Sequence, residues 1–453
     1  MAKRVTAIAP VDELWALPTG WRWERLGSVA STVGGGRLKF NKSHYVESGY
    51  PAYSAAGQDG LLDRWEFDGE AVVLSSIGAR CGKSFYAKGR WASLANTQCI
   101  MPDSELNARY LWYYTNNEER WERSGSAQPF IKPSTIKSLP IPLPPLEVQR
   151  RIVARIDELF AEVDDGEAAL ARARDDVATW RRALLKAAVT GELTADWRTS
   201  NPPTETGDEL LSRVLADRRI RWEAAPKNKG KVYAEPIGPE GDNLPALHPG
   251  WAWVSLAQIA SEQERSFQSG PFGSALLHSE FQDTGHLVIG IDNVQQGYFS
   301  KGADHRISEE KFQELRRFQA RPKDVLITVM ATIGRTCVVP EDVEDAIVTK
   351  HLYRITTAKN VADPTFVSTC LRASPSTVNY LFGNTLGQTR PGLNKSILER
   401  APVPIAPIAE QKRALQIVAE QIEGTSAILD DLKGCSATLR QSILAAAFRG
   451  DLV

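Results

Sequence analysis

The chain has 453 residues, and a typical size of about 150 residues per domain predicts two to four domains. Hydrophobic residues make up 42% and charged residues 24%, which is the composition of a folded protein and excludes disorder over most of the chain. Lys and Arg number 54 against 55 Asp and Glu, so any nucleic-acid surface has to be a local patch.

The sequence also bears on the cellular compartment. No apolar run approaches the roughly 20 residues that cross a bilayer, and Asp12 and Glu13 interrupt the short apolar stretch near the start, unlike a signal peptide. The cysteines are odd in number and show no CxxC spacing: Cys81, Cys99, Cys337, Cys370 and Cys435. Unpaired thiols are typical of a reducing compartment. We therefore expect a cytoplasmic protein.

One internal duplication organises the chain. Four landmarks recur in the same order: residues 20–30 (GWRWERLGSVA) with 250–260 (GWAWVSLAQIA), Ile77-Gly78 and Cys81 with Ile333-Gly334 and Cys337, 140–151 (PIPLPPLEVQRR) with 402–413 (PVPIAPIAEQKR), and 184–193 (LLKAAVTGEL) with 443–452 (ILAAAFRGDL). Ordered recurrence of this kind predicts two copies of one unit of about 200 residues.

Each copy begins with a globular segment, residues 1–145 in the first and 246–408 in the second. Short apolar runs of strand type alternate there with Gly, Pro, Asn and Asp turns. The pairs Trp21/Trp23 and Trp251/Trp253 alternate with period two, which places each pair on one face of a strand as core anchors. We expect a mixed α/β domain in each copy.

A helical segment ends each copy, at residues 146–193 and 409–453. Apolar residues recur at heptad spacing with charges between them, which predicts a coiled coil, and each helix follows a proline-rich joint that cannot be helical and reads as a stiff hinge. The predicted seam residues are Ile156, Leu159, Val163, Leu170, Val177 and Leu184 in the first helix, and Leu415, Val418, Ile422, Leu429, Leu432, Leu439 and Ile443 in the second.

The predicted architecture follows from the duplication. Residues 194–245 form a polar linker with one exposed helix at 207–225. Two similar units that pack on each other favour a pseudo-twofold axis, which makes the two helices antiparallel. We expect an α+β fold, with two mixed α/β domains separated by two long antiparallel helices that form a coiled coil.

Catalytic and metal-binding motifs are not found. The six histidines show no ligand spacing, and no phosphate-binding loop of the GxxxxGK[ST] type occurs. The peptide Asn201-Pro202-Pro203-Thr204 lacks the aromatic residue that stacks on a flipped base in amino-methyltransferases, and no acidic-x-Lys follows Pro102-Asp103 as in a restriction nuclease. We assign no catalytic residue and no metal ligand.

Binding chemistry is what remains. Residues 1–145 hold 17 Lys and Arg against 14 Asp and Glu, a weak excess. Arg and Lys side chains read guanine or contact phosphates, and Gln reads adenine. The candidate DNA-binding residues in expected loops are Arg37, Lys39, Lys42, Gln58, Arg80, Lys83 and Gln98 in the first domain, and Arg265, Gln268, Ser269, Arg335, Lys350, Gln388, Arg390 and Lys395 in the second.

In combination these features resemble the specificity (S) subunits of type I restriction–modification enzymes. The resemblance covers nearly the whole chain. It is carried by residues 49–85 and 96–102 in the first domain, by 269–277, 324–339 and 387–411 in the second, and by 191–198 (GELTADWR) at the end of the first helix.

The resemblance implies two target-recognition domains, each of which binds one half of a bipartite asymmetric site in double-stranded DNA. The helices would set the spacing and dock two adenine-methylating modification subunits, and restriction subunits with translocase and nuclease activity would join them. This chain would be non-catalytic and without a cofactor of its own, whereas its partners would use S-adenosylmethionine, ATP and Mg. The two helical repeats differ by three residues in register, so the family does not give the spacer length.

Two alternatives compete with this hypothesis. A coiled-coil scaffold whose domains bind proteins rather than DNA fits the near-neutral charge, and it predicts no salt-dependent affinity for DNA. A self-contained enzyme is disfavoured by the missing motifs.

Overall fold

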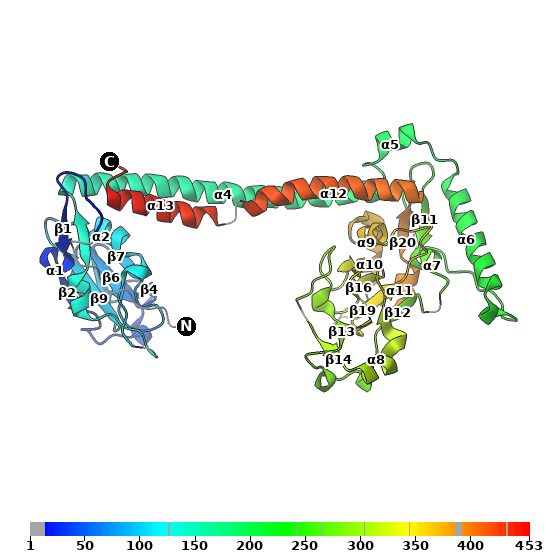
Figure 1. The fold of residues 1–453 in the computed structure, drawn as a ribbon, viewed down its shortest axis with the longest axis horizontal. Coiled ribbons are helices and arrows are strands. Elements are labelled where there is room, and N and C mark those ends of the chain that lie inside the picture. The colour runs from blue at the N-terminus through cyan, green and yellow to red at the C-terminus, as the bar shows by residue number, and fades with distance from the viewer. Residues whose placement is uncertain are drawn as a thin grey trace. The chain divides into compact units, whose positions relative to one another are not determined.

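The structure is a computed structural model. It describes residues 14–125, 127–241, 243–263, 265–302, 304–343, 345–385, 392–431 and 434–453, with the side chains of 426–431 left out. The chain divides into two compact units, Met1–Arg172 with Leu432–Val453, and Ala173–Asp431 (Figure 1). Each unit holds one globular head and one part of the helical repeats. The first head is residues 14–145, and the second head is residues 246–408.

The first head contains two four-stranded sheets. The first sheet is antiparallel and has the order β2 (Ala30–Gly34), β9 (Thr97–Pro102), β6 (Ala71–Ser75), β7 (Ser84–Ala87). The second has the order β4 (Gly57–Leu62), β3 (Tyr50–Ser54), β8 (Arg90–Ser93), β5 (Phe67–Asp68), in which β3 and β8 are parallel. β6 is buried at every position, in line with its continuous apolar run. The helices are α1 (Leu26–Val29), α2 (Ala108–Thr115) and α3 (Pro133–Ser138).

The second head repeats this topology strand for strand. Its antiparallel sheet has the order β12 (Phe267–Ser269), β19 (Leu352–Ile355), β16 (Val325–Thr328), β17 (Thr336–Val338). The other has the order β14 (Arg306–Ile307), β13 (His286–Ile289), β18 (Ala346–Val348), β15 (Gln319–Ala320), again with one parallel pair, β13 and β18. The helices are α7 (Leu256–Ile259), α8 (Glu309–Leu315), α9 (Pro364–Ala373), α10 (Pro375–Gly383) and α11 (Lys395–Arg400). The duplication inferred from the sequence is thus also a duplication of fold.

One landmark of the duplication was aligned wrongly. In the turn between β6 and β7, Ser75 N–H donates to the Lys83 carbonyl, and Gly82 N–H donates to the Ser75 carbonyl, both at 2.8 Å. The same two bonds join Thr328 to Arg335 and Gly334 at 2.9 and 3.0 Å. Gly82 and Gly334 are therefore the equivalent residues, not Gly78 and Gly334, because the turn is one residue shorter in the second copy.

The proline-rich joints are strands rather than hinges. β10 (Pro140–Leu143) pairs antiparallel with β1 (Arg22–Arg25), and β20 (Pro402–Ile405) pairs in the same way with β11 (Ala252–Ser255). Proline has no N–H, so a strand with proline at alternate positions pairs on one side only. Each pair accordingly remains a two-stranded ribbon, and the joint belongs to the head.

Side chains of the heads satisfy the outward carbonyls of these ribbons. The Tyr114 and Tyr110 hydroxyls donate to the carbonyls of Pro140 and Pro142 at 2.8 and 2.7 Å. In the second head the Thr377 hydroxyl donates to the Pro402 carbonyl at 2.6 Å. Burial of these acceptors without partners would be costly, so the bonds hold each ribbon against its head.

The tryptophan pairs differ from the expectation of paired core anchors. Trp251 is buried, and Trp21 packs in part against the first core. Trp23 and Trp253 are half-buried, and their indole N–H groups donate to the carbonyls of Trp15 and Pro245 at 3.2 and 2.8 Å. Trp21 and Trp251 lie one residue before β1 and β11, so the alternation within the strand does not apply to them, and only the first tryptophan of each pair serves the core.

α4 (Leu146–Thr190) is one continuous helix of 45 residues, whereas the second repeat forms α12 (Ile408–Asp431) and α13 (Cys435–Arg449). Gly434, which precedes α13, has a left-handed backbone with φ of 81°. The second helical repeat is therefore not the single long helix that its heptads predicted.

The helices pair antiparallel within each unit. In the first unit Ala447 and Phe448, near the end of α13, share a core with Ile152 and Ile156, near the beginning of α4. In the second unit Ala414 and Val418, near the beginning of α12, share a core with Leu184 and Ala188, near the end of α4.

The seam positions are buried to different degrees. Ile156, Leu184 and Val418 are buried, and seven further positions are half-buried: Leu159, Val163, Leu170, Val177, Leu415, Ile422 and Ile443. Leu439 does not lie in a seam, since it is 52% exposed. The break before α13 shifts the heptad that placed it there. Leu429 and Leu432 fall outside the described side chains.

The segment between the repeats contains α5 (Ala195–Ser200), α6 (Gly207–Ala224) and a 3₁₀ turn at Pro226–Asn228. Thr206 caps α6 and forms a capping box with Glu209, and α6 packs beside β11 of the second head. None of the helices in the described part of the chain is long and apolar enough to cross a membrane. Four of the five cysteines are buried, and Cys435 is exposed.

Candidate nucleic-acid interface

Two turns of the first head meet through Arg80. This residue lies between β6 and β7, and its guanidinium donates to the Ala56 carbonyl, between β3 and β4, at 3.2 Å. Gln58, at the start of β4, is exposed beside this contact. Arg80 and Gln58 therefore lie on neighbouring turns, as a shared binding surface requires.

Lys42 is tied to the protein by a carboxylate. Its ammonium lies 2.5 Å from Asp59, which also accepts hydrogen bonds from the hydroxyls of Tyr45 at 2.6 Å and Ser54 at 2.8 Å. Burial alone would raise the pKa of Asp59, but these three partners outweigh it and lower that pKa. Asp59 thus stays ionised and offsets the charge of Lys42, which makes Lys42 a weaker phosphate ligand than its residue type indicated.

Arg37, Lys39 and Gln98 lie around the loop that follows β2. Arg37 is 64% exposed and pairs at 3.7 Å with Glu66, whose side chain is only 8% exposed. Burial raises the pKa of Glu66, and Arg37 opposes that shift. Lys39 is exposed with φ of 54°, and Gln98 pairs with Gly34 across β2 and β9. The loop after β2 and the neighbouring strand β9 together carry three of the predicted residues.

The corrected alignment brings Lys83 and Arg335 into equivalence. Each residue directly precedes the edge strand of its antiparallel sheet. Lys83 lies 3.7 Å from Glu118, and Arg335 donates to the Gln295 side chain at 3.4 Å. The two heads present different cations at one position of a common scaffold.

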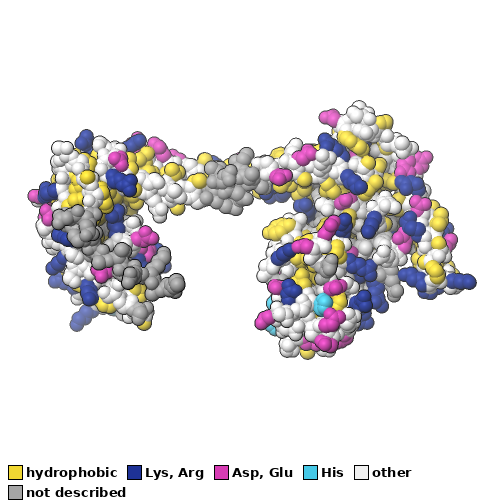
Figure 2. All heavy atoms as spheres, in the orientation of Figure 1, with side chains coloured by type: hydrophobic (Ala, Val, Ile, Leu, Met, Phe, Trp, Pro, Cys, Tyr) yellow, Lys and Arg dark blue, Asp and Glu magenta, His cyan; other side chains and the backbone are white. Residues whose placement is uncertain are grey.

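In the second head, Arg265, Gln268 and Lys395 line one groove of about 630 Å³. Arg218 of α6 and Arg400 of α11 complete its cationic wall, and sequence reasoning missed both. The signal was present, because the linker carries a run of basic residues from Arg218 onward. Figure 2 shows Lys and Arg side chains gathered where the second head faces α6 and at the far end of α6.

The remaining candidates are not brought into this groove. Ser269 is buried, and its hydroxyl lies 3.5 Å from the Gly270 carbonyl. The prediction that Ser269 is a DNA-binding residue on the surface is therefore wrong. Lys350 is exposed after β18 and does not line the groove. Gln388 and Arg390 lie outside the described residues.

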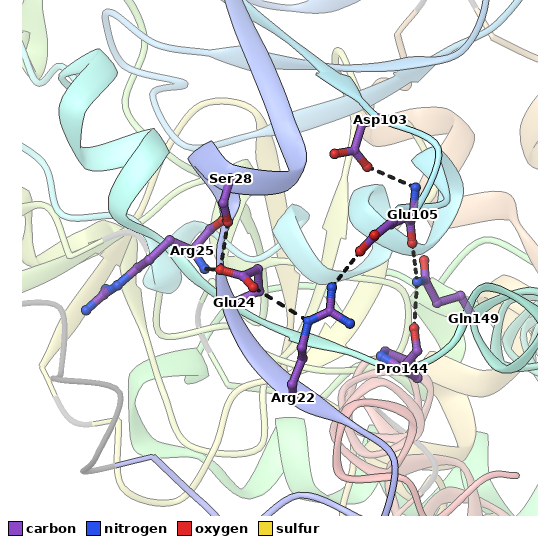
Figure 3. Close-up of polar contacts among 8 residues, drawn as sticks. All are labelled: Arg22, Glu24, Arg25, Ser28, Asp103, Glu105, Pro144 and Gln149. Atoms are coloured by element: carbon purple, nitrogen blue, oxygen red, sulfur yellow. Dashed lines mark hydrogen bonds and ion pairs between the residues drawn. The ribbon is translucent and has the colours of Figure 1, made fainter.

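A buried glutamine joins each head to its helix. The Gln149 side-chain amide donates to the carbonyls of Glu105 and Pro144, both at 2.8 Å, and its oxygen accepts from the backbone N–H of Asn107 at 2.8 Å. Gln149 has no exposed surface. Figure 3 shows it lying between the loop before α2 and the end of the joint, beside the ion pair of Arg22 with Glu105 at 2.5 Å.

Gln411 makes the same three bonds in the second unit. Its amide donates to the carbonyls of Val361 and Ala406 at 2.8 and 2.7 Å, and its oxygen accepts from Asp363 N–H at 2.9 Å. These glutamines occupy equivalent places in the third landmark of the duplication, but neither was predicted to have a role. A polar residue at the same place in both copies, just inside a helix, was the available signal.

Comparisons with known proteins agree with this geometry. Residues 18–169 match the family described as the type I restriction modification DNA specificity domain. The EcoDI specificity subunit of Escherichia coli is 23% identical over 444 residues, 96% of this chain and 89% of that one. The StySPI specificity subunit of Salmonella potsdam is 35% identical over 130 residues, 26% and 28% of the two chains.

Two solved structures share the fold. The HsdS subunit from Thermoanaerobacter tengcongensis has a TM-score of 0.54 at 18% identity, covering 97% of this chain and 99% of that one. A chain from a structure of type I R-M system assembly has a TM-score of 0.60 at 18% identity, covering 97% and 100%.

The fold defines a protein with two similar heads, built by duplication, each of which packs on its own part of the antiparallel helices. More particularly, residues 18–169 match the family of type I restriction modification DNA specificity domains, and the similarity to specificity subunits runs through nearly the whole chain.

Proposed function

We propose that this chain is the DNA sequence-recognition subunit of a type I restriction–modification complex, in which each head binds one half of a bipartite asymmetric site. The observation that carries the proposal is the repeated strand order with different side chains at equivalent turns, such as Lys83 and Arg335. A common scaffold with different contact residues is what reading two different half-sites requires.

The helices would set the distance between half-sites and dock two modification subunits. The duplication supports two equivalent docking surfaces, because a pseudo-twofold partner presents the same surface twice. The modification subunits would use S-adenosylmethionine to methylate adenine, and restriction subunits would bring ATP and Mg. This chain would act in the cytoplasm and contribute specificity without a catalytic residue, a role that the name of its relatives, specificity subunits, supports.

The direct test is a long-read methylome of cells that express this chain with its modification subunit, against cells that lack this chain. The expected result is a split N6-methyladenine motif that depends on the chain. Exchange of residues 14–145 for the first head of a relative should change one half of that motif and leave the other half intact. A motif unchanged after the exchange would contradict head-by-head reading.

The scaffold hypothesis gives a different result in solution. Binding through phosphate contacts releases counterions and weakens steeply with salt. A full chain that shows no salt-dependent affinity for duplex DNA, with its modification subunit present, would favour the scaffold.

A further inference from the structure

The segment between the repeats has a packed structure of its own at its far end. The Trp222 and Tyr233 rings lie 5.3 Å apart, and the Arg219 guanidinium lies 5.4 Å from the Tyr233 ring. The Asn228 side-chain amide donates to the Trp222 carbonyl at 2.8 Å. The chain therefore leaves α6, turns at Pro226–Asn228 and returns along α6 as a packed hairpin, which holds the backbone that carries the tip side chains.

This hairpin is strongly basic. Residues 217–231 contain six Lys and Arg and two acidic residues. Arg219 pairs with Glu235 and Arg221 with Glu262, so two of these charges are compensated. The tip lysines, Lys227, Lys229 and Lys231, are exposed and have no ion-pair partner among the described residues.

The groove beside the hairpin continues this charge onto the second head. Its walls carry Arg218, Arg265, Lys395 and Arg400 against two carboxylates, Glu235 and Glu399. Glu399 already pairs with Lys395 at 3.2 Å, and Glu235 pairs with Arg219. Arg218 donates to the neutral Ala260 carbonyl, so that contact leaves its charge in place. We name the three tip lysines and this groove together the linker cationic surface.

We propose that the linker cationic surface binds the phosphate backbone of duplex DNA next to the half-site that the second head reads. The inference rests on the proposed function and adds a second type of contact to it. Phosphates are the ligand that clustered, exposed Lys and Arg side chains fit, and such contacts position a protein without reading sequence. Arg265 and Gln268 line the groove and are also candidate DNA-binding residues of the second head. A duplex that contacts these two residues therefore lies against the groove.

The first head has no counterpart of this surface within its described residues. The tip lysines and Arg218 come from α6 and the returning chain, which lie between the copies and outside the duplicated segments. Backbone contacts should therefore be unequal at the two half-sites, with more of them at the second.

The test compares two triple variants of the full chain, each bound to its modification subunits. The first is Lys227→Gln, Lys229→Gln and Lys231→Gln. The control, Lys301→Gln, Lys323→Gln and Lys359→Gln, removes the same charge from exposed positions of the same unit. Each complex is titrated with salt against a duplex carrying the methylated motif, and phosphate-ethylation interference maps its backbone contacts.

The tip variant should reduce the slope of log affinity against log salt by about 2–3, since each lost phosphate contact contributes about 0.9. It should also lose interference at phosphates beside the second half-site, with the methylated motif unchanged. The control should match the wild type. An unchanged slope and interference pattern would overturn the inference, as would loss of subunit assembly with DNA contacts intact, which would indicate a protein partner. Failure of the wild-type complex to bind its duplex would instead count against the proposed function.

Discussion

The glutamines Gln149 and Gln411 show how single side chains couple a head to a helix. Each satisfies two backbone carbonyls and one backbone N–H in a fully buried place. A helix start and a loop that share one side chain cannot move independently without leaving buried polar groups unpaired. Each head is therefore held to its helix by a side chain that is fully buried within the chain itself.

Substitution of either glutamine by leucine should loosen its own head only. Gln149→Leu leaves one N–H and two carbonyls without partners, at a cost of about 2–4 kcal/mol to local stability. Hydrogen exchange should then rise in α2 but not in α9, and Gln411→Leu should give the reverse. Equal exchange in both helices after one substitution would contradict separate clamps.

A buried ion pair in the second head gives a further prediction. Arg354 and Asp324 are almost fully buried and 3.4 Å apart, and Asp324 also accepts from Arg321 N–H at 2.8 Å. Burial raises the pKa of Asp324, and Arg354 opposes that shift. Arg354→Leu should destabilise the second head by about 3–5 kcal/mol in thermal unfolding, because it leaves a carboxylate buried without its cation.

The double variant Arg354→Leu with Asp324→Asn separates charge from packing. It removes both charges and should recover much of the lost stability, since no uncompensated charge remains. A double variant as unstable as Arg354→Leu would assign the loss to packing around the guanidinium.

At the scale of elements, local periodicity in the sequence predicted individual helices and strands, but it did not predict which strands pair. The apolar run of β6 and the heptads of α4 are patterns among residues a few positions apart in the sequence, so both elements could be predicted. The pairing of β10 with β1 joins residues more than 110 positions apart, and proline content alone indicated a hinge. Prolines at alternate positions were compatible with a one-sided strand, but no local pattern identifies the partner.

Turn length limited the alignment in the same way. A glycine and a cysteine in each copy suggested a match at Gly78, and only the hydrogen bonds of Ser75 and Thr328 place Gly82 opposite Gly334. For a similar reason, the residues of the candidate site could be predicted only in part. Residue type found Arg265, Gln268 and Lys395, which meet in one groove, but included the buried Ser269 because burial depends on the folded surroundings.

At the scale of the whole molecule, the family resemblance and the duplication identified the architecture and the proposed role. The polar linker is the segment for which the sequence predicted the least structure and function. Its basic residues lie outside the repeated pattern, so nothing in the first copy drew attention to them, and their relation to the second head is a tertiary contact.

The length of α4 gives a prediction at this scale. Four residues inserted after Ala171 lengthen the helix by about 6 Å, the axial rise of about two base pairs. The spacer of the methylated motif should grow by one or two base pairs with both half-sites unchanged. Four residues inserted after Gly230, in the linker hairpin, should leave the spacer as it was. Retention of the original spacer after the α4 insertion would show that this helix does not set it.

The break before α13 has a practical consequence. Burial raises the thiol pKa to about 12 for Cys99 and Cys337, and it raises the pKa of Cys81 and Cys370 as well, so all four stay protonated and shielded from reagents. Cys435, exposed directly after Gly434, is the position where a maleimide dye can attach without any mutation. A dye at this position would let fluorescence test in real time whether modification subunits or duplex DNA bind near the start of α13.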